Sequence, residues 1–198
     1  TSNTTGDNNT ASGFEALKSN TTGSGSVAIG YEALETATTE GSLTAIGYQA
    51  AKANTTGTGT VALGYQALTS NTTGEANTAS GFEALKSNTT GGYNTASGYQ
   101  SLYSNTTGAN NTSLGYQSLY QSTTGGDNTA LGHSTLLSNT SGSSNVAIGK
   151  NALRDNTSGY YNVAIGVESL FENTTISQLV GIGSVSYTHL TLPTMIRV

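Results

Sequence analysis

Apolar and polar residues alternate in a short block that recurs every 17 residues along most of the chain. The clearest copy is N-V-A-I-G at residues 162–166, where Val163 and Ile165 alternate with Ala164 as on the two faces of a strand. Even a 15-residue stretch, residues 9–23, returns letter for letter at 77–91. Each block ends at a glycine, and these glycines are Gly13, Gly30, Gly47, Gly64, Gly81, Gly98, Gly115, Gly132, Gly149, Gly166 and Gly183.

A strict period without insertions predicts a solenoid, because each coil stacks on the previous one and an inserted residue would shift every later side chain. The short alternating block favours a β-solenoid of the parallel β-roll type, with about eleven 17-residue coils stacked at roughly 4.8 Å. Residues 1–184 are predicted to form a single repeat array. We expect this array to be a fragment that lacks capping coils at both ends.

The columns formed by equivalent residues of successive coils predict which side chains point inward. The middle strand residue is nearly always Ala, as at Ala28 and Ala62, so we expect it to face a tightly packed interior. The residues on either side of it vary between Val/Ile and Thr/Ser, which indicates a face that is half-exposed or contacts another chain. One polar column is expected to form a ladder of side-chain amides: Asn20, Asn54, Asn71, Asn88, Asn105, Asn139, Asn156 and Asn173.

The segment after each glycine, such as Y-Q-A-L at residues 65–68, separates an aromatic residue from a leucine by three positions. This spacing favours one short helical turn per coil over a second strand. The coil then closes at T-T-G, and its glycine is expected to adopt the positive φ that many turns require. Examples are Gly23, Gly57, Gly74, Gly91 and Gly108.

Composition and charge exclude several functions. The net charge is −5, with only six Lys and Arg residues, so there is no basic surface for nucleic acid. No apolar run is long enough to cross a membrane, and we expect no membrane insertion of this segment. The chain has no cysteine, so disulfides do not hold it together. No cofactor or metal motif is present, and we expect neither.

The polar columns do not predict an enzyme. Glu32 and Glu83 share a column with Gln49 and Gln66, and catalysis would not tolerate this exchange, so a solvated face is the better interpretation. His133 occupies a column otherwise filled mainly by Tyr and Phe and has no repeating partner, which indicates a tolerated variant. No Ser or Thr column has a His and Asp partnership. Catalytic and metal sites are therefore predicted to be absent.

One column is aromatic and suggests a binding surface. It could stack sugar rings, although the pattern favours the alternative that it fills the core with its hydroxyl groups reaching water. A less favoured hypothesis is that the paired threonines, such as Thr72 and Thr73, present hydroxyl groups to ice. The candidate aromatic ladder consists of Tyr31, Tyr48, Tyr65, Phe82, Tyr99 and Tyr116.

The motifs "SVAIGYEAL", "TVALGYQAL" and "NVAIG" resemble the YadA-like head repeats of trimeric autotransporter adhesins. They resemble even more the N-T-A-I-G-Y-x-A-L repeat arrays of phage tail fibres and bacterial surface proteins. The adhesin head repeat is usually shorter than 17 residues. The resemblance covers residues 1–184 and implies a homotrimer of parallel β-rolls, exposed on a bacterial surface or a virion, that attaches to a glycan or another host receptor. The implied role is structural and adhesive.

The end of the chain departs from the repeat. The stretch "VSYTHLTLPT" at residues 185–194 fits no column and contains the only proline, Pro193. It resembles the translated product of a sequencing adapter. We therefore expect residues 185–198 to be a non-native tail, with a natural C-terminal strand, "THLTL", as the alternative.

Overall fold

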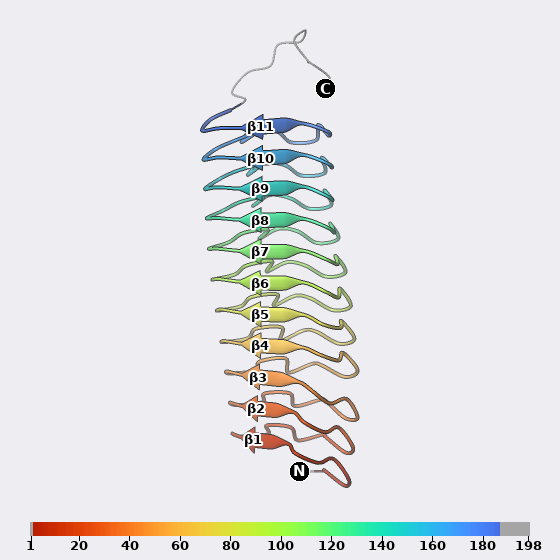
Figure 1. Cartoon of the computed structure of the whole chain (residues 1–198). Helices are drawn as coiled ribbons and strands as arrows, with labels where there is room; N and C mark the ends of the chain where they lie inside the picture. Colours follow the sequence, from red (N-terminus) through yellow and green to blue (C-terminus); the bar gives the residue numbers. More distant parts are fainter. Residues whose placement is uncertain (1, 187–198) are drawn as a thin grey trace.

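The computed structural model describes residues 2–186 and confirms a parallel β-solenoid (Figure 1). Within these residues, eleven strands of three residues each form one sheet in which the strand order is the chain order. Neighbouring strands are parallel and pair without any shift, so that Ala28 lies opposite Ala45. The strands are β1 (Thr10–Ser12), β2 (Val27–Ile29), β3 (Thr44–Ile46), β4 (Val61–Leu63), β5 (Thr78–Ser80), β6 (Thr95–Ser97), β7 (Thr112–Leu114), β8 (Thr129–Leu131), β9 (Val146–Ile148), β10 (Val163–Ile165) and β11 (Val180–Ile182).

Backbone hydrogen bonds between coils extend far beyond the strands. On the side opposite the sheet, the N–H of Leu68 donates to the carbonyl of Ala84 at 3.0 Å. In the closing turn, the N–H of Thr72 donates to the carbonyl of Thr89 at 2.9 Å. Because bonds of this kind occur on several sides of each coil, an insertion would break the pairing with both neighbours. This explains the constant coil length.

The predicted helical turn after each glycine is wrong, since residues 2–186 contain no helix. The segment instead forms successive tight turns, in which Ala67 N–H bonds to the carbonyl of Gly64 and Thr69 N–H to that of Gln66. The φ angles of Gln66 and Leu68 are 51° and 53°, in the left-handed region that reverses the chain direction. An aromatic residue and a leucine three positions apart are therefore compatible with two such turns as well as with one helical turn.

The prediction that the closing glycines adopt positive φ is also wrong: Gly57, Gly74 and Gly91 are not among the residues with positive φ. They are needed because the coils approach closely. A Cβ atom added at Gly91 would lie 2.3 Å from the carbonyl oxygen of Gly108 and 2.7 Å from the Asn88 Oδ1 atom. Steric contact with the next coil therefore selects glycine here.

The core is thin and consists mainly of alanine and leucine. The strand alanines Ala28 to Ala164 are fully buried, as predicted, and leucines such as Leu68 and Leu85 fill the space behind them. In one coil a large and a small side chain change places: Ala51 stands where other coils have leucine, and Leu43 stands where most have asparagine. Both residues are fully buried. The interior volume thus stays filled although two columns change.

The coil pattern continues slightly beyond the predicted boundary at residue 184. Val185 N–H bonds to the carbonyl of Val167, and Ser186 accepts a hydrogen bond from Leu170 N–H through its backbone carbonyl. Most of the tail that was expected to be non-native, residues 187–198, lies outside the described residues.

Candidate functional surfaces

The aromatic ladder lies on the outside of the solenoid. Its central members, Tyr31 to Tyr116, are 41–44% exposed, so the expectation that this column fills the core is wrong. Neighbouring rings from Phe14 to Tyr116 are stacked with centroids 5.0–5.2 Å apart and interplanar angles of 6–13°. The His133 ring continues the stack on Tyr116 at 4.9 Å. Alanine and leucine already fill the interior, which leaves the rings outside.

Stacking determines which part of each ring meets solvent. Each inner ring of the ladder has another ring on both faces, at the spacing of offset aromatic pairs. The exposed parts are therefore the ring edges and the tyrosine hydroxyl groups. A sugar that stacks on aromatic rings needs an open face, and the interior of this ladder offers none.

The predicted asparagine ladder is confirmed, and it is buried. The Nδ2 atom of Asn88 donates to Asn71 Oδ1 at 2.7 Å and to the carbonyl of Gly91 in the same turn at 2.9 Å. Asn71 and Asn105 make the equivalent bonds, so the amides satisfy one another from coil to coil. Buried amides are stable in this arrangement because donors and acceptors are paired.

A second asparagine ladder, which the sequence analysis missed, runs before the strands. Asn94 donates from Nδ2 to Asn77 Oδ1 at 3.2 Å and to the carbonyl of Gly108 at 2.9 Å. Both ladders therefore converge on the closing glycines. The signal was present in the sequence, since asparagine occupies this column six times in succession: Asn77, Asn94, Asn111, Asn128, Asn145 and Asn162.

The first asparagine ladder is interrupted where Ala37 and Ser122 replace asparagine. Next to each interruption an amide oxygen loses its partner: Asn20 Oδ1 and Asn105 Oδ1 are buried without a hydrogen bond. The Ser122 hydroxyl is also buried and unpaired. These atoms mark the weak points of an otherwise paired interior.

The Glu and Gln column is half-buried and hydrogen-bonded, which differs from the solvated face that was expected. Gln66 donates to Gln49 Oε1 at 2.7 Å, and Gln49 donates to Glu32 Oε2 at 2.8 Å. Lys52 also pairs with Glu32. The hydrogen bond from Lys52, followed by that from Gln49, lowers the pKa of Glu32 below its ordinary value.

Three carboxylates near the start of the rod have the spacing of a metal site, with ligand atoms of Glu15, Glu32 and Glu35 within 4.8 Å of one another. Two lysines already lie among them, because Lys18 pairs with Glu15 at 2.8 Å and Lys52 pairs with Glu35 at 3.2 Å. Their ammonium groups balance most of the negative charge. The cluster is therefore an ion-pair network on the surface.

The outward residues of the strands form a second exposed surface, which we call the strand face. Ile29, Ile46 and Ile165 are 37–40% exposed, and Leu131 is 45% exposed. The residues of this face are apolar or carry hydroxyl groups, and none in β1–β11 is charged. The strand face has apolar segments at β2–β4 and β7–β11, separated by the Thr/Ser strands β5 and β6.

The paired threonines do not form a regular hydroxyl surface. In most pairs the first threonine donates its hydroxyl to a backbone carbonyl of the next coil, as Thr72 does to Thr89 at 3.0 Å. Its hydroxyl group is thus directed along the rod. This leaves one exposed column of hydroxyl groups, which includes those of Thr73 and Thr90. A single column provides little support for the ice-binding hypothesis.

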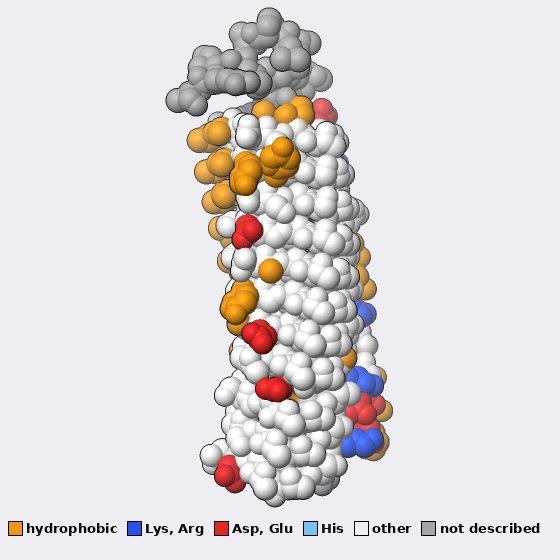
Figure 2. Space-filling model, turned by 90° about the vertical axis from the view of Figure 1, so that its right-hand side faces the viewer, with side chains coloured by type: hydrophobic (Ala, Val, Ile, Leu, Met, Phe, Trp, Pro, Cys, Tyr) orange, Lys and Arg blue, Asp and Glu red, His pale blue; other side chains and the backbone are white. Residues whose placement is uncertain are grey.

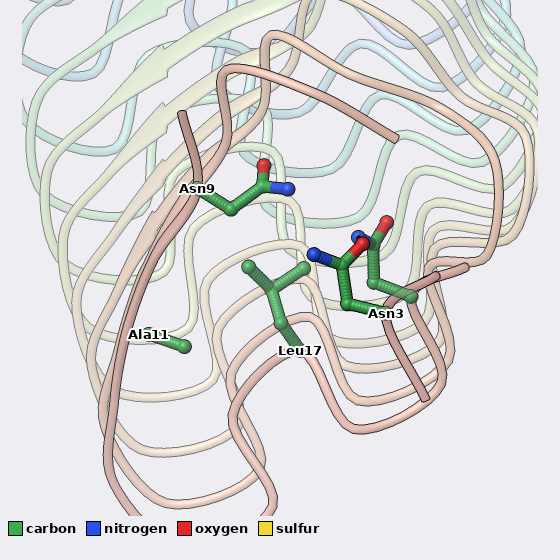
Figure 3. A pocket seen from close by; sticks show the side chains of 5 residues that line it. Asn3, Asn9, Ala11 and Leu17 are labelled. Atoms are coloured by element: carbon green, nitrogen blue, oxygen red, sulfur yellow. Dashed lines mark hydrogen bonds between the residues drawn. The ribbon is translucent and has the colours of Figure 1, made fainter. Parts of the chain in front are cut away.

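A hollow of about 190 Å³ lies at the first described coil. The side chains of Asn3, Asn9 and Leu17 point into it, with Ala11 at its side (Figure 3). In later coils the same columns are buried against the preceding coil. The hollow is therefore the end of the core rather than a separate site.

The fold and surfaces define the chain as a parallel β-solenoid repeat protein. No protein-family model matches the chain, and no curated protein or solved structure is significantly similar to it. None of the described residues belongs to a helix with the length and hydrophobicity needed to cross a membrane.

Proposed function

We propose that this solenoid is a structural and adhesive segment of an extracellular fibre, on a bacterial surface or a phage tail, and that it assembles side by side into a homotrimer. Its role is mechanical reach and attachment to a host receptor, without enzymatic activity. The resemblance of the V-A-I-G-Y motifs to adhesin heads and tail-fibre arrays supports this role. Hydrogen bonds from coil to coil support it further, because they suit a stiff rod.

The strand face is the observation that carries the proposal. Exposed isoleucines and leucines recur at one position of successive coils, where a monomer would leave them in water. A neighbouring copy has the same repeat and the same spacing, so each apolar strand can meet an equivalent strand along the rod. The absence of charge from β1–β11 on this face removes the main cost of burying it.

Light scattering on a sizing column tests the proposal with the whole 198-residue chain. We expect three times the chain mass of 20.0 kDa. The double variant Ile46→Asp, Ile148→Asp places charges on two apolar segments of the strand face, and it should run as one chain because a buried unpaired carboxylate is unfavourable.

Thr73→Asp is the matched control, since it adds a charge on an exposed turn away from the strand face and should leave the mass unchanged. Circular dichroism checks that each variant keeps its β structure. A wild-type mass of one chain would contradict the trimer, as would a trimeric double variant.

A further inference from the structure

One row of residues, exposed except for the half-buried Ser144, runs along the turns that lead into the strands. We call it the turn edge and define it as Tyr93, Asn110, Asp127, Ser144 and Tyr161, one residue from each of five successive coils. Backbone bonds align the row, such as Asn110 N–H to the Gly92 carbonyl at 3.1 Å and Asp127 N–H to that of Ala109 at 2.9 Å. Four coil rises place its terminal tyrosines roughly 19 Å apart.

The two tyrosines of the turn edge adopt a backbone conformation that bulky residues avoid. The φ angles of Tyr93 and Tyr161 are 59° and 56°, and glycine occupies the equivalent position at Gly25 and Gly59. Tyr93 and Tyr161 are 63% and 60% exposed, so their rings are largely free of packing contacts. Backbone bonds between coils hold the whole column in this conformation, at Ser42, Ala76 and Gln178 as well, so the positive φ belongs to the coil and the tyrosines add exposed rings to it.

The rings of the turn edge are open, unlike those of the aromatic ladder. Tyr160 and Tyr161 meet edge to face, with centroids 5.4 Å apart and an interplanar angle of 81°. Such a pair leaves ring faces free for a ligand. Within residues 2–186, Tyr93 has no aromatic neighbour in stacking contact.

The residues between the tyrosines are polar and acidic. Asn110 Nδ2 donates to Asp127 Oδ1 at 3.1 Å, and Ser144 follows in the next coil. Figure 2 shows this side of the rod, where acidic and hydrophobic side chains are scattered and Lys and Arg side chains appear only at the margin. Asp7, Glu40 and Glu75 lie in the equivalent turns of earlier coils, so a negatively charged ligand would be repelled.

We propose that the turn edge between Tyr93 and Tyr161 binds a linear neutral glycan that lies parallel to the rod. Sugar rings would stack on the open tyrosine faces, and the side chains of Asn110, Asp127 and Ser144 would bond sugar hydroxyl groups. A pyranose unit is comparable in length to one coil rise, so successive units can meet successive coils. The inference rests on the proposed attachment function and adds the ligand class and its site.

Affinity gel electrophoresis of the whole chain tests this site. The gels contain a neutral linear polysaccharide, namely β-1,4-glucan, α-1,4-glucan or β-1,4-mannan, or the anionic polymer alginate. We expect retardation by at least one neutral polymer and none by alginate. Tyr93→Gly and Tyr161→Gly should each weaken retardation about tenfold. Both variants should keep or raise the unfolding temperature, because glycine relieves the positive φ.

Tyr65→Ala is the matched control, since it removes a stacked ring of the aromatic ladder and should leave retardation unchanged. Three results would overturn the proposal: no retardation by any neutral polymer, equal retardation of both glycine variants and the wild type, or loss of retardation in Tyr65→Ala. The trimer proposal is tested separately by mass, so the failure of one can be distinguished from the failure of the other.

Discussion

The asparagine ladders and the aromatic ladder repeat once per coil with the same spacing, but they lie on opposite sides of the backbone. The amides are inside and fully buried, whereas the rings are outside and more than 40% exposed. Hydrophobicity alone would predict the reverse. The difference shows that in this solenoid a buried column is selected by size and by hydrogen bonding between identical neighbours, as at Asn71 and Asn88.

Breaking an asparagine ladder should change the free energy of unfolding the most. Asn88→Ala removes the hydrogen bonds to Asn71, Gly91 and Asn105 and leaves buried partners unpaired. We expect a loss of about 2–3 kcal/mol in the free energy of unfolding, measured by urea denaturation. Thr90→Ala, on the exposed side of the same turn, should change stability by less than about 0.5 kcal/mol. Equal effects of the two variants would mean that the ladder contributes nothing specific.

Completing an asparagine ladder should give the next largest change in the free energy of unfolding, and this change should be a gain in stability. Ser122→Asn supplies a donor for the unpaired Asn105 Oδ1 and an acceptor for Asn139. We expect a gain of about 1 kcal/mol in the same urea measurement. Ser158→Asn, which adds an amide to an exposed turn position, should be neutral. A destabilised Ser122→Asn protein would show that the interior has no room for the amide.

Breaking the aromatic ladder should lower the free energy of unfolding by less than breaking an asparagine ladder. Tyr65→Ala removes two stacking contacts, to Tyr48 and Phe82, and opens no cavity in the core. We expect a loss of about 1 kcal/mol together with a weaker near-ultraviolet circular dichroism signal. Tyr93→Ala removes an unstacked ring and should change neither. A loss for Tyr65→Ala as large as that for Asn88→Ala would contradict the contrast between the two ladders.

A change in the half-buried Glu and Gln column should have the smallest effect on stability, and the size of this effect should depend on pH. The pKa of Glu32 is lower in the folded state than its ordinary value of 4.5, so the unfolded state binds more protons near that pH. Its stabilising contribution is therefore present above pH 4.5 and is lost as the pH falls through the folded pKa. The difference in unfolding temperature between the wild type and Glu32→Gln should shrink from pH 7 to pH 3. A difference that does not vary with pH would exclude this linkage.

The sequence predicted the features that depend on stacking identical residues. The 17-residue period, the buried alanines around Ala62 and the amide ladder through Asn71 all follow from one requirement, that equivalent residues lie directly above one another. Features that depend on contacts between different columns were harder to predict. Tyr65 and Leu68 are three positions apart both in a helix and in two successive turns, so their spacing did not distinguish the two.

The errors share a physical cause. Leucine rarely adopts positive φ, so nothing local to Leu68 indicated the turn that hydrogen bonds to both adjacent coils impose. The usual preference of glycine for positive φ considers only its own φ and ψ, and it therefore predicts the wrong conformation for Gly91. Its actual constraint is the carbonyl of Gly108 in the next coil. The turn edge escaped notice because a variable column carries no repeat signal.

Constant coil length has a consequence for how such a gene can change. The identical segments at residues 9–23 and 77–91 are four whole coils apart, so unequal crossing-over between them would delete or add 68 residues at once. The joined coils would pair like the original ones, because β1 and β5 have the same sequence and the same position within the 17-residue coil. The length of the rod can therefore evolve in single genetic events without passing through a misfolded intermediate.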